Sequence, residues 1–262
     1  MITVRATARL IVVFMLVLFL VPPVFGTTIA LHTGANNPLS ELWTYHENGT
    51  GVLVGALSPD DGYGCDAWYV DDQVGYYGYY SYALTADQVQ AADDYGWRLA
   101  AFLRLPDIPD PAAAGDGSPF ISYRDGSHIF QLHFGTQDDG DPIVRLYAAN
   151  HSYAIEGGGA GYHSYVLEYQ PGNGVSFLVD GTEYLSGWSG ASFSSSPVVL
   201  WGAASSRPTG RGNFNRVEFE TVPEPATAWL LLAGVALLCC STGKRKRLFA
   251  RVRKNETGQE EW

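Results

Sequence analysis

Two uninterrupted apolar runs, one near each end, limit how much of this 262-residue chain can form a globular domain. The first run spans Leu10 to Val21, and the second, Ala226 to Leu238, contains no charged residue. Long apolar runs without charges are typical of segments that enter a membrane rather than of surface elements. The stretch between them, Thr27 to Thr221, is therefore the part expected to fold as a domain, and it is long enough to bury one sizeable core.

The N-terminal segment has the layout of a secretory signal peptide. Two arginines precede the apolar run, a Pro-Pro pair ends it, and Val24 and Gly26 stand at the −3 and −1 positions of a cleavage site. The run is shorter than the roughly 20 residues that a membrane-spanning helix needs. Residues 1–26 are therefore predicted to be a cleaved signal peptide, with an uncleaved membrane anchor as the alternative.

The C-terminal apolar segment, about residues 226–241, is predicted to form a single transmembrane helix. It is short for a span, but basic side chains at its end can extend towards the lipid headgroups. The basic cluster that follows, Lys244-Arg245-Lys246-Arg247, acts as a stop-transfer signal and is retained on the cytoplasmic side. A buried core helix is the alternative, and the basic block at the end of the run speaks against it.

The order of motifs in this tail resembles the PEP-CTERM sorting signal of Gram-negative bacteria. The motifs are Val222-Pro223-Glu224-Pro225, the apolar segment and the basic cluster, and together they cover residues 222–247. The resemblance implies export across the inner membrane, processing by an exosortase that recognises the Pro-Glu-Pro motif, and a final place in the membrane or at the cell surface. It also implies a bacterium that makes exopolysaccharide and biofilm.

One feature departs from that signal. Tails of the PEP-CTERM kind end soon after the basic cluster, whereas this chain continues from Leu248 to Trp262, which is expected to be a cytoplasmic overhang. On the simplest alternative reading, Pro-Glu-Pro is a rigid extended linker in front of a membrane helix.

The segment from Thr27 to Thr221 is strongly acidic. It holds seven arginines, no lysine and 23 carboxylates, which gives a formal charge of −16. Such a domain repels nucleic acid, so nucleic-acid binding is excluded, whereas neutral polysaccharides and divalent cations are compatible with it. Cys65 is its only cysteine, so no disulfide can form within it; a shielded thiol is expected, and an intermolecular disulfide is the alternative.

Short apolar stretches and abundant glycine and tyrosine predict an all-β fold. In residues 175–185, apolar and polar side chains alternate up to Asp180-Gly181, a strong two-residue hairpin signal. With the preceding turn at 171–174, residues 164–185 are predicted to form three consecutive antiparallel strands. Further strands are expected at residues 97–105, 120–124, 128–134, 143–147, 197–202 and 215–221.

One short helix is predicted at residues 85–94, because Thr85 and Gln88 fit a capping box and Gly96 lies just beyond its end. The fold class is therefore a jelly-roll-like antiparallel β-sandwich with one short helix.

The order of the strands resembles the concanavalin A-like lectin/glucanase superfamily, which includes laminin G-like domains. The stretches that carry the resemblance are Gly96-Trp97-Arg98-Leu99, Tyr162-His163-Ser164-Tyr165, the Val-Asp-Gly turn at 179–181, Leu200-Trp201-Gly202 and residues 212–217. Each is weak alone, and fold does not determine function. Glucanases of this superfamily carry Glu-x-Asp-x-x-Glu or a close variant, and no such motif occurs here.

Three sets of residues are candidates for chemistry. Glu218 and Glu220 share one face of a strand, but solvent-facing charge on an edge strand is the favoured interpretation over catalysis. Asp-Gly turns offer oxygen ligands for Ca²⁺, with ordinary β-turns as the alternative; the candidate ligands are Asp138, Asp139 and Asp141, followed by Asp60 and Asp61.

The aromatic run at residues 76–82 is the main candidate for carbohydrate binding, because tyrosine rings stack on sugar faces and donate hydrogen bonds. The residues singled out are Trp68, Tyr76, Tyr77, Tyr79 and Tyr80. Trp188 and Trp201 are assigned to the core. The sequence therefore favours an exported, non-enzymatic module that binds glycan or associates with exopolysaccharide; a divergent polysaccharide hydrolase and a purely structural adhesion protein are the alternatives.

Overall fold

A computed structural model describes residues 26–49, 51–60, 62–72, 76–106, 119–137, 139–148, 151–204 and 210–222. The predicted signal peptide up to Phe25, the sorting motif from Pro223 onwards and the predicted transmembrane segment lie outside these residues. In the described part, no helix is both long enough and apolar enough to span a membrane. Residues 26–222 form one compact unit.

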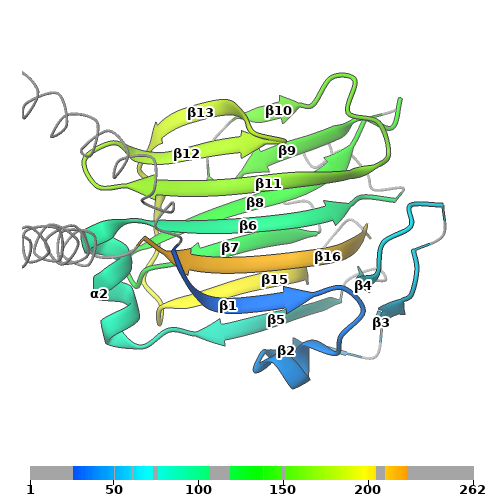
Figure 1. Cartoon of the computed structure of the whole chain (residues 1–262), viewed down its shortest axis with the longest axis horizontal. Coiled ribbons are helices and arrows are strands. Elements are labelled where there is room, and N and C mark those ends of the chain that lie inside the picture. The colour runs from blue at the N-terminus through cyan, green and yellow to red at the C-terminus, as the bar shows by residue number, and fades with distance from the viewer. Residues whose placement is uncertain are drawn as a thin grey trace, which may run out of the picture. The chain divides into compact units, whose positions relative to one another are not determined.

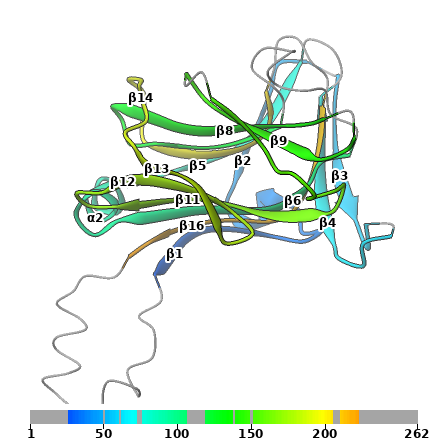
Figure 2. The ribbon, with the colours of Figure 1, turned by 90° about the horizontal axis from the view of Figure 1, so that it is seen from above.

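This unit is an all-β sandwich of two antiparallel sheets, each with eight strands (Figures 1 and 2). Sheet A has the order β13-β12-β11-β6-β16-β4-β3, and β1 also pairs with β16. Its strands are β1 (Thr27–Thr33), β3 (Val52–Leu57), β4 (Ala67–Asp72), β6 (Trp97–Arg104), β11 (Tyr162–Gln170), β12 (Gly174–Val179), β13 (Thr182–Trp188) and β16 (Gly210–Thr221).

Sheet B has the order β10-β9-β8-β7-β15-β5-β2, and β14 also pairs with β8. Its strands are β2 (Thr44–Glu47), β5 (Tyr77–Ala83), β7 (Phe120–Arg124), β8 (His128–Thr136), β9 (Pro142–Leu146), β10 (Ser152–Ala154), β14 (Ala191–Ser192) and β15 (Val198–Ala204). Two helical segments join strands: the 3₁₀ turn η1 (Pro38–Glu41) and the α-helix α2 (Ala86–Tyr95).

The local predictions are confirmed. The stretch 164–185 forms β11, β12 and β13 in antiparallel succession, and the β12–β13 turn places both Asp180 and Gly181 at positive φ, as a type I′ turn requires. Helix α2 begins after Thr85, whose side chain and that of Gln88 make the predicted capping box. Strand β6 alternates buried and half-buried residues along its whole length.

The prediction that the last strand lies at a sheet edge is wrong. Strand β16 lies inside sheet A: β6 pairs along one side, while β4 and β1 pair with the two halves of the other. Strand β1, at the other end of the domain, covers the side of β16 that was expected to be free. A contact between segments so far apart leaves no local signal in the sequence.

Aromatic side chains fill much of the space between the sheets, and two of their clusters are centred on buried tryptophans. Trp201 of β15 is completely buried and stacks on Tyr80 and His32, each with a ring-centroid distance of 4.7 Å. Trp97 of β6 packs edge-on against Tyr123 of β7 at 4.7 Å, close to α2. The assignment of Trp201 to the core is confirmed. Trp188, also assigned to the core, is only half-buried and packs against Phe130 of the Trp97 cluster, which extends to the end of the sandwich.

Candidate functional site

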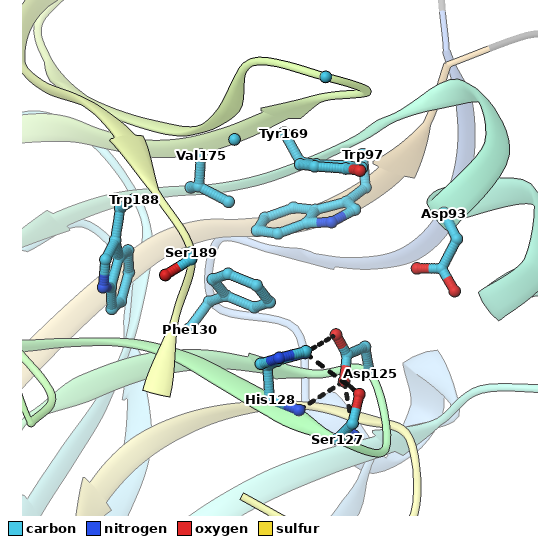
Figure 3. Close-up of a pocket in the computed structure, with 12 residues that line it drawn as sticks. Asp93, Trp97, Asp125, Ser127, His128, Phe130, Tyr169, Val175, Trp188 and Ser189 are labelled. Carbon is cyan, nitrogen blue, oxygen red and sulfur yellow. Dashed lines mark hydrogen bonds and ion pairs between the residues drawn. The ribbon is translucent and has the colours of Figure 1, made fainter. Parts of the chain in front are cut away.

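A cavity of about 540 Å³ opens at the end of the sandwich next to α2 (Figure 3). Sheet A contributes residues of β6, β11, β12 and β13, while sheet B contributes the start of β8 and its turn from β7. The volume falls in the range of roughly 300–1,000 Å³ that is usual for small-molecule sites.

Aromatic rings form one wall of this end cavity. Trp97 and Phe130 are buried at its base, while Tyr169 and Trp188 are half-buried at its rim. The Trp188 ring meets Phe130 edge-on at 5.6 Å, and Tyr169 stacks on Trp97 at 6.1 Å. The two rim rings therefore present partly exposed flat surfaces supported from below by a rigid aromatic layer.

Polar side chains from the turn between β7 and β8 form the opposite wall (Figure 3). Asp125 Oδ1 accepts hydrogen bonds from the backbone N–H groups of Ser127 and His128 at 2.7 and 2.6 Å. This is the Asx turn that the Asp-Gly-Ser sequence favours, and Gly126 at its centre has a φ of 112°. The turn fixes the carboxylate before any ligand arrives.

The second oxygen of Asp125 orients His128. His128 Nδ1 lies 3.0 Å from Asp125 Oδ2, and since a carboxylate only accepts hydrogen bonds, Nδ1 carries the proton of the neutral ring. Nε2 of His128 is then an acceptor, and Asp125 Oδ2 keeps a free lone pair. Both can accept hydrogen bonds from ligand hydroxyls.

Two carboxylates at this cavity have pKa values that move in opposite directions. Burial tends to raise the pKa of Asp125, but hydrogen bonds from Ser127 and His128 outweigh it and lower that pKa. Partial burial, followed by the charges of Asp125 and Asp94, raises the pKa of Asp93, which projects from α2. Asp125 therefore stays ionised over a wide pH range, whereas Asp93 takes up a proton more readily.

The predicted aromatic ligand residues do not lie at this cavity, and they divide between core and surface. Trp68 and Tyr80 are buried, with Trp68 Nε1 donating to Tyr80 Oη at 3.0 Å, so a sugar cannot reach their faces. Tyr76 and Tyr77 are exposed, and Tyr79 is half-buried on the outer face of sheet B. Only these last three are available to a ligand.

The acidic candidates for calcium are used by the protein's own donors. Asp141 accepts from the backbone of Gly157 and Gly159, each at 2.7 Å, and Asp139 accepts from the backbone of Asp141 at 3.1 Å. Among the residues that the structure describes, no group of three or more histidine, cysteine, aspartate or glutamate side chains could hold a metal. Asp138 lies outside them, as does Asp61, so the calcium site stays a prediction.

Asp60, the other candidate, is the centre of a buried hydrogen-bond network. It forms a bidentate ion pair with Arg104 and also accepts from Tyr162 and Asn213. The Glu218 carboxylate, on the outer face of sheet A, accepts hydrogen bonds from Arg216 and Thr28. These two donors occupy the carboxylate.

Glu220 of the same strand accepts a hydrogen bond from Arg98 at 3.2 Å. Each member of the Glu218–Glu220 pair is thus held by an arginine, and neither lines the end cavity. Cys65 is half-buried and free.

The residues of the end cavity were missed from the sequence because they come from six separate elements and the turn between β7 and β8. A local signal was available in Asp125-Gly126-Ser127-His128, a sequence that favours an Asx turn between two predicted strands.

Comparison with known proteins identifies the tail. Residues 221–247 match the family model described as the PEP-CTERM protein-sorting motif. A sequence search of curated proteins gave no match.

Solved structures resemble the sandwich at low sequence identity. A carbohydrate esterase from the Shiga toxin-encoding bacteriophage phi24B has a TM-score of 0.51 and 13% identity, over 76% of this chain and 100% of that one. A protein of unknown function from Shewanella oneidensis MR-1 has a TM-score of 0.46 and 9% identity over 79% and 92%.

A structure of botulinum neurotoxin type C has a TM-score of 0.45 and 9% identity, and the match covers 78% of this chain but only 50% of the toxin chain. The esterase match supports the β-sandwich fold alone, and at such identity it carries no function. The chain thus consists of an antiparallel β-sandwich followed in sequence by a PEP-CTERM sorting motif. The motif indicates export and processing at the membrane in a Gram-negative bacterium.

Proposed function

We propose that this protein is an exported surface module, sorted by an exosortase, whose sandwich binds neutral polysaccharide in the end cavity. The observation that supports this most directly is the division of the cavity into an aromatic wall and a hydrogen-bonding wall. Sugars have apolar C–H faces and equatorial hydroxyl groups, so a ring seated here stacks on Trp188 and Tyr169 while its hydroxyls reach Asp125 and His128.

The charge of the domain supports a neutral ligand. Its formal charge of −16 and the ionised Asp125 at the cavity disfavour a polyanion there. Carboxylate and imidazole acceptors suit hydroxyl donors, which every neutral sugar supplies.

Binding is tested by affinity electrophoresis of the full chain in gels that contain a neutral polysaccharide, first a β-glucan and then a galactomannan. Trp188→Ala is expected to abolish the retardation, while Trp188→Phe retains part of it because a smaller ring still stacks. Tyr77→Ala is the matched control, since it removes an exposed ring from sheet B, outside the cavity. Equal retardation of wild type and Trp188→Ala, or loss in Tyr77→Ala alone, would contradict the proposal.

A second candidate function, hydrolysis of the bound polysaccharide, is favoured by one observation. Asp93 and Asp125 line the same cavity with pKa values displaced in opposite directions, as in acid–base pairs of hydrolases. Release of reducing ends from a retained polysaccharide, lost in Asp93→Asn but not in the exposed control Asp87→Asn, would favour it. Retardation without release leaves binding as the function.

The sorting part of the proposal concerns Pro223-Glu224-Pro225. Changing Pro223 and Pro225 to alanine is expected to leave the full-length chain unprocessed in the membrane fraction of an exosortase-containing host. Its C-terminal fragments are followed by immunoblot with an epitope after Trp262. A fragment pattern identical to that of the wild type would show that the motif serves only as a linker.

A further inference from the structure

The outer face of sheet B holds a second, smaller cavity of about 240 Å³. Its walls are formed by outward-facing residues of β5, β7, β8 and β15, together with Tyr147 and Phe193. Phe193 follows β14 and lies with its ring 4.7 Å from the guanidinium of Arg124. The volume is below the range for drug-sized ligands, so the cavity suits a single sugar residue.

Arg124 is the unusual residue of this cavity. Three other arginines of the domain donate to carboxylates: Arg98 to Glu220, Arg104 to Asp60 and Arg216 to Glu218. The ring of Phe193 packs on the guanidinium of Arg124, Tyr79 and Tyr147 interact with its charge, and its Nε is buried without a hydrogen-bond partner. A buried donor without an acceptor is rare in folded proteins and calls for an explanation.

Burial of Arg124 also disfavours its charge, which lowers its pKa although the tyrosines act in the opposite direction. A domain with 23 carboxylates nevertheless places none at this guanidinium within the part of the chain that the structure describes. The site is thus one positive charge, partly desolvated and still able to donate hydrogen bonds.

The rest of the cavity provides flat rings and an amide. Phe120 lies 6.3 Å from Tyr79 and 6.4 Å from His133, so the rings form a continuous aromatic lining. Gln131 and His133, both buried, share a hydrogen bond of 2.7 Å between their Nε2 atoms, in which the amide donates and the imidazole accepts. The carbonyl oxygen of Gln131 is then directed away from that bond.

From this arrangement we propose that the outer face of sheet B is a second binding site, specific for a sugar residue that bears a carboxylate. The guanidinium of Arg124 forms paired hydrogen bonds to the carboxylate, as arginine does better than any other side chain. The sugar ring lies against the aromatic lining, to which Tyr79 and Phe120 belong. One site of this kind, together with the end cavity, would allow the domain to join an acidic glycan to a neutral one.

Two kinds of sugar carry such a carboxylate, uronic acids and sialic acids, and the experiment separates them. Isothermal titration calorimetry of the full chain uses D-glucuronic acid, N-acetylneuraminic acid and glucuronic acid methyl ester, which lacks the charge. The expected result is binding of either acid, with at least tenfold weaker binding of the ester. The acid that binds more tightly shows whether the ligand is a uronic acid or a sialic acid. Equal affinity for the ester and glucuronic acid, or no heat with both acids, would overturn the proposal.

Substitutions locate the binding. Arg124→Met keeps the apolar stem and is expected to abolish binding of the acid; Arg124→Lys keeps the charge without the paired geometry and is expected to weaken binding about tenfold. The matched control is Arg98→Met, which removes a half-buried arginine from sheet A. Trp188→Ala must leave this binding unchanged, which distinguishes it from the end cavity. If Arg124→Met binds the acid like the wild type, the assignment fails. The comparison with the methyl ester tests the same proposal on the wild-type protein and so does not depend on the folding of a variant.

Discussion

The network around Asp60 makes a quantitative prediction about stability. The Asp60 carboxylate is 5% exposed and the Arg104 side chain 14%, and the ion pair has N···O distances of 2.8 and 2.9 Å. Oδ2 accepts from Tyr162 and Asn213 as well. These contacts connect the loop after β3 to β6, β11 and β16, three adjacent strands of sheet A.

Replacing Asp60 by asparagine keeps the shape and removes the charge. The amide nitrogen then faces an Arg104 donor, and the arginine remains buried without a counter-charge. Breaking a buried ion pair from one side costs about 3–5 kcal/mol, and we expect about 3 kcal/mol because Arg104 keeps some contact with water. For a domain of this size that corresponds to a melting temperature lower by roughly 6–12 °C.

The measurement is thermal unfolding of the full chain in mild detergent at pH 7, followed by near-ultraviolet circular dichroism. Glu156→Gln, an exposed charge removal, is the control and should stay within about 0.5 kcal/mol of the wild type. The double variant Asp60→Asn/Arg104→Met should be more stable than the sum of the single changes predicts, because no charge is left unpaired. At about 2–4 °C per kcal/mol, a melting temperature for Asp60→Asn within 2 °C of the wild type means a loss of at most about 1 kcal/mol. That result would refute the reasoning.

The pH dependence of the same variant follows from the pKa of Asp60. Burial raises this pKa, but hydrogen bonds from Arg104, Asn213 and Tyr162 outweigh it, so the folded-state pKa lies below the ordinary value. The stabilisation is therefore fully present above the unfolded pKa of about 3.9 and is lost as pH falls through the folded value. The difference between wild type and Asp60→Asn should be constant from pH 7 to 5 and should shrink below about pH 4.

Three further changes test other parts of the fold. Thr85→Ala removes the cap of α2 and should lower the free energy of unfolding by about 1 kcal/mol, with Thr85→Ser as the control that restores it. Gly202→Ala should cost about 2–3 kcal/mol, since a Cβ there would lie 2.7 Å from the β5 backbone; Gly181→Ala, in open space, should cost less. Asp93→Asn should raise the melting temperature at pH 7, because partial burial and then the charges of Asp125 and Asp94 oppose ionisation of Asp93. The gain should vanish well below the unfolded pKa of about 3.9, where Asp93 is protonated in both folded and unfolded chains.

The parts of the fold that were predicted correctly depend on local chemistry. The Asp180-Gly181 turn and the Thr85 cap are set by residues within four positions of each other, and β6 shows its alternation without help from other strands. Strands β1 to β5 were not predicted. Their sequences show no clean alternation of apolar and polar residues, and β5 is a strand because β2 and β15 pair with it on both sides.

The tyrosine run at 76–82 shows what amino-acid composition alone can and cannot predict about a binding surface. It marked a real aromatic surface, but strand geometry divides its members between the two faces of sheet B: Tyr80 faces the core and Tyr79 the outside. A ligand can meet only the outer set, and the partners of that set, Phe120 and His133, come from β7 and β8 and not from the run itself. The sequence could identify the residue type but not its neighbours.

The same reasoning explains why Arg124 was overlooked. In the sequence it is one of seven arginines in an acidic domain, and each would be expected to find a carboxylate. Only the sheet order shows that its outward-facing neighbours on β8, β15 and β5 are Ile129, Leu200 and Tyr79 rather than acids. Among the residues that the structure describes, no carboxylate pairs with Arg124 in its aromatic-lined cavity, and a partly buried unpaired charge is costly to maintain for stability alone. That cost is the physical reason to seek its counter-ion in a ligand.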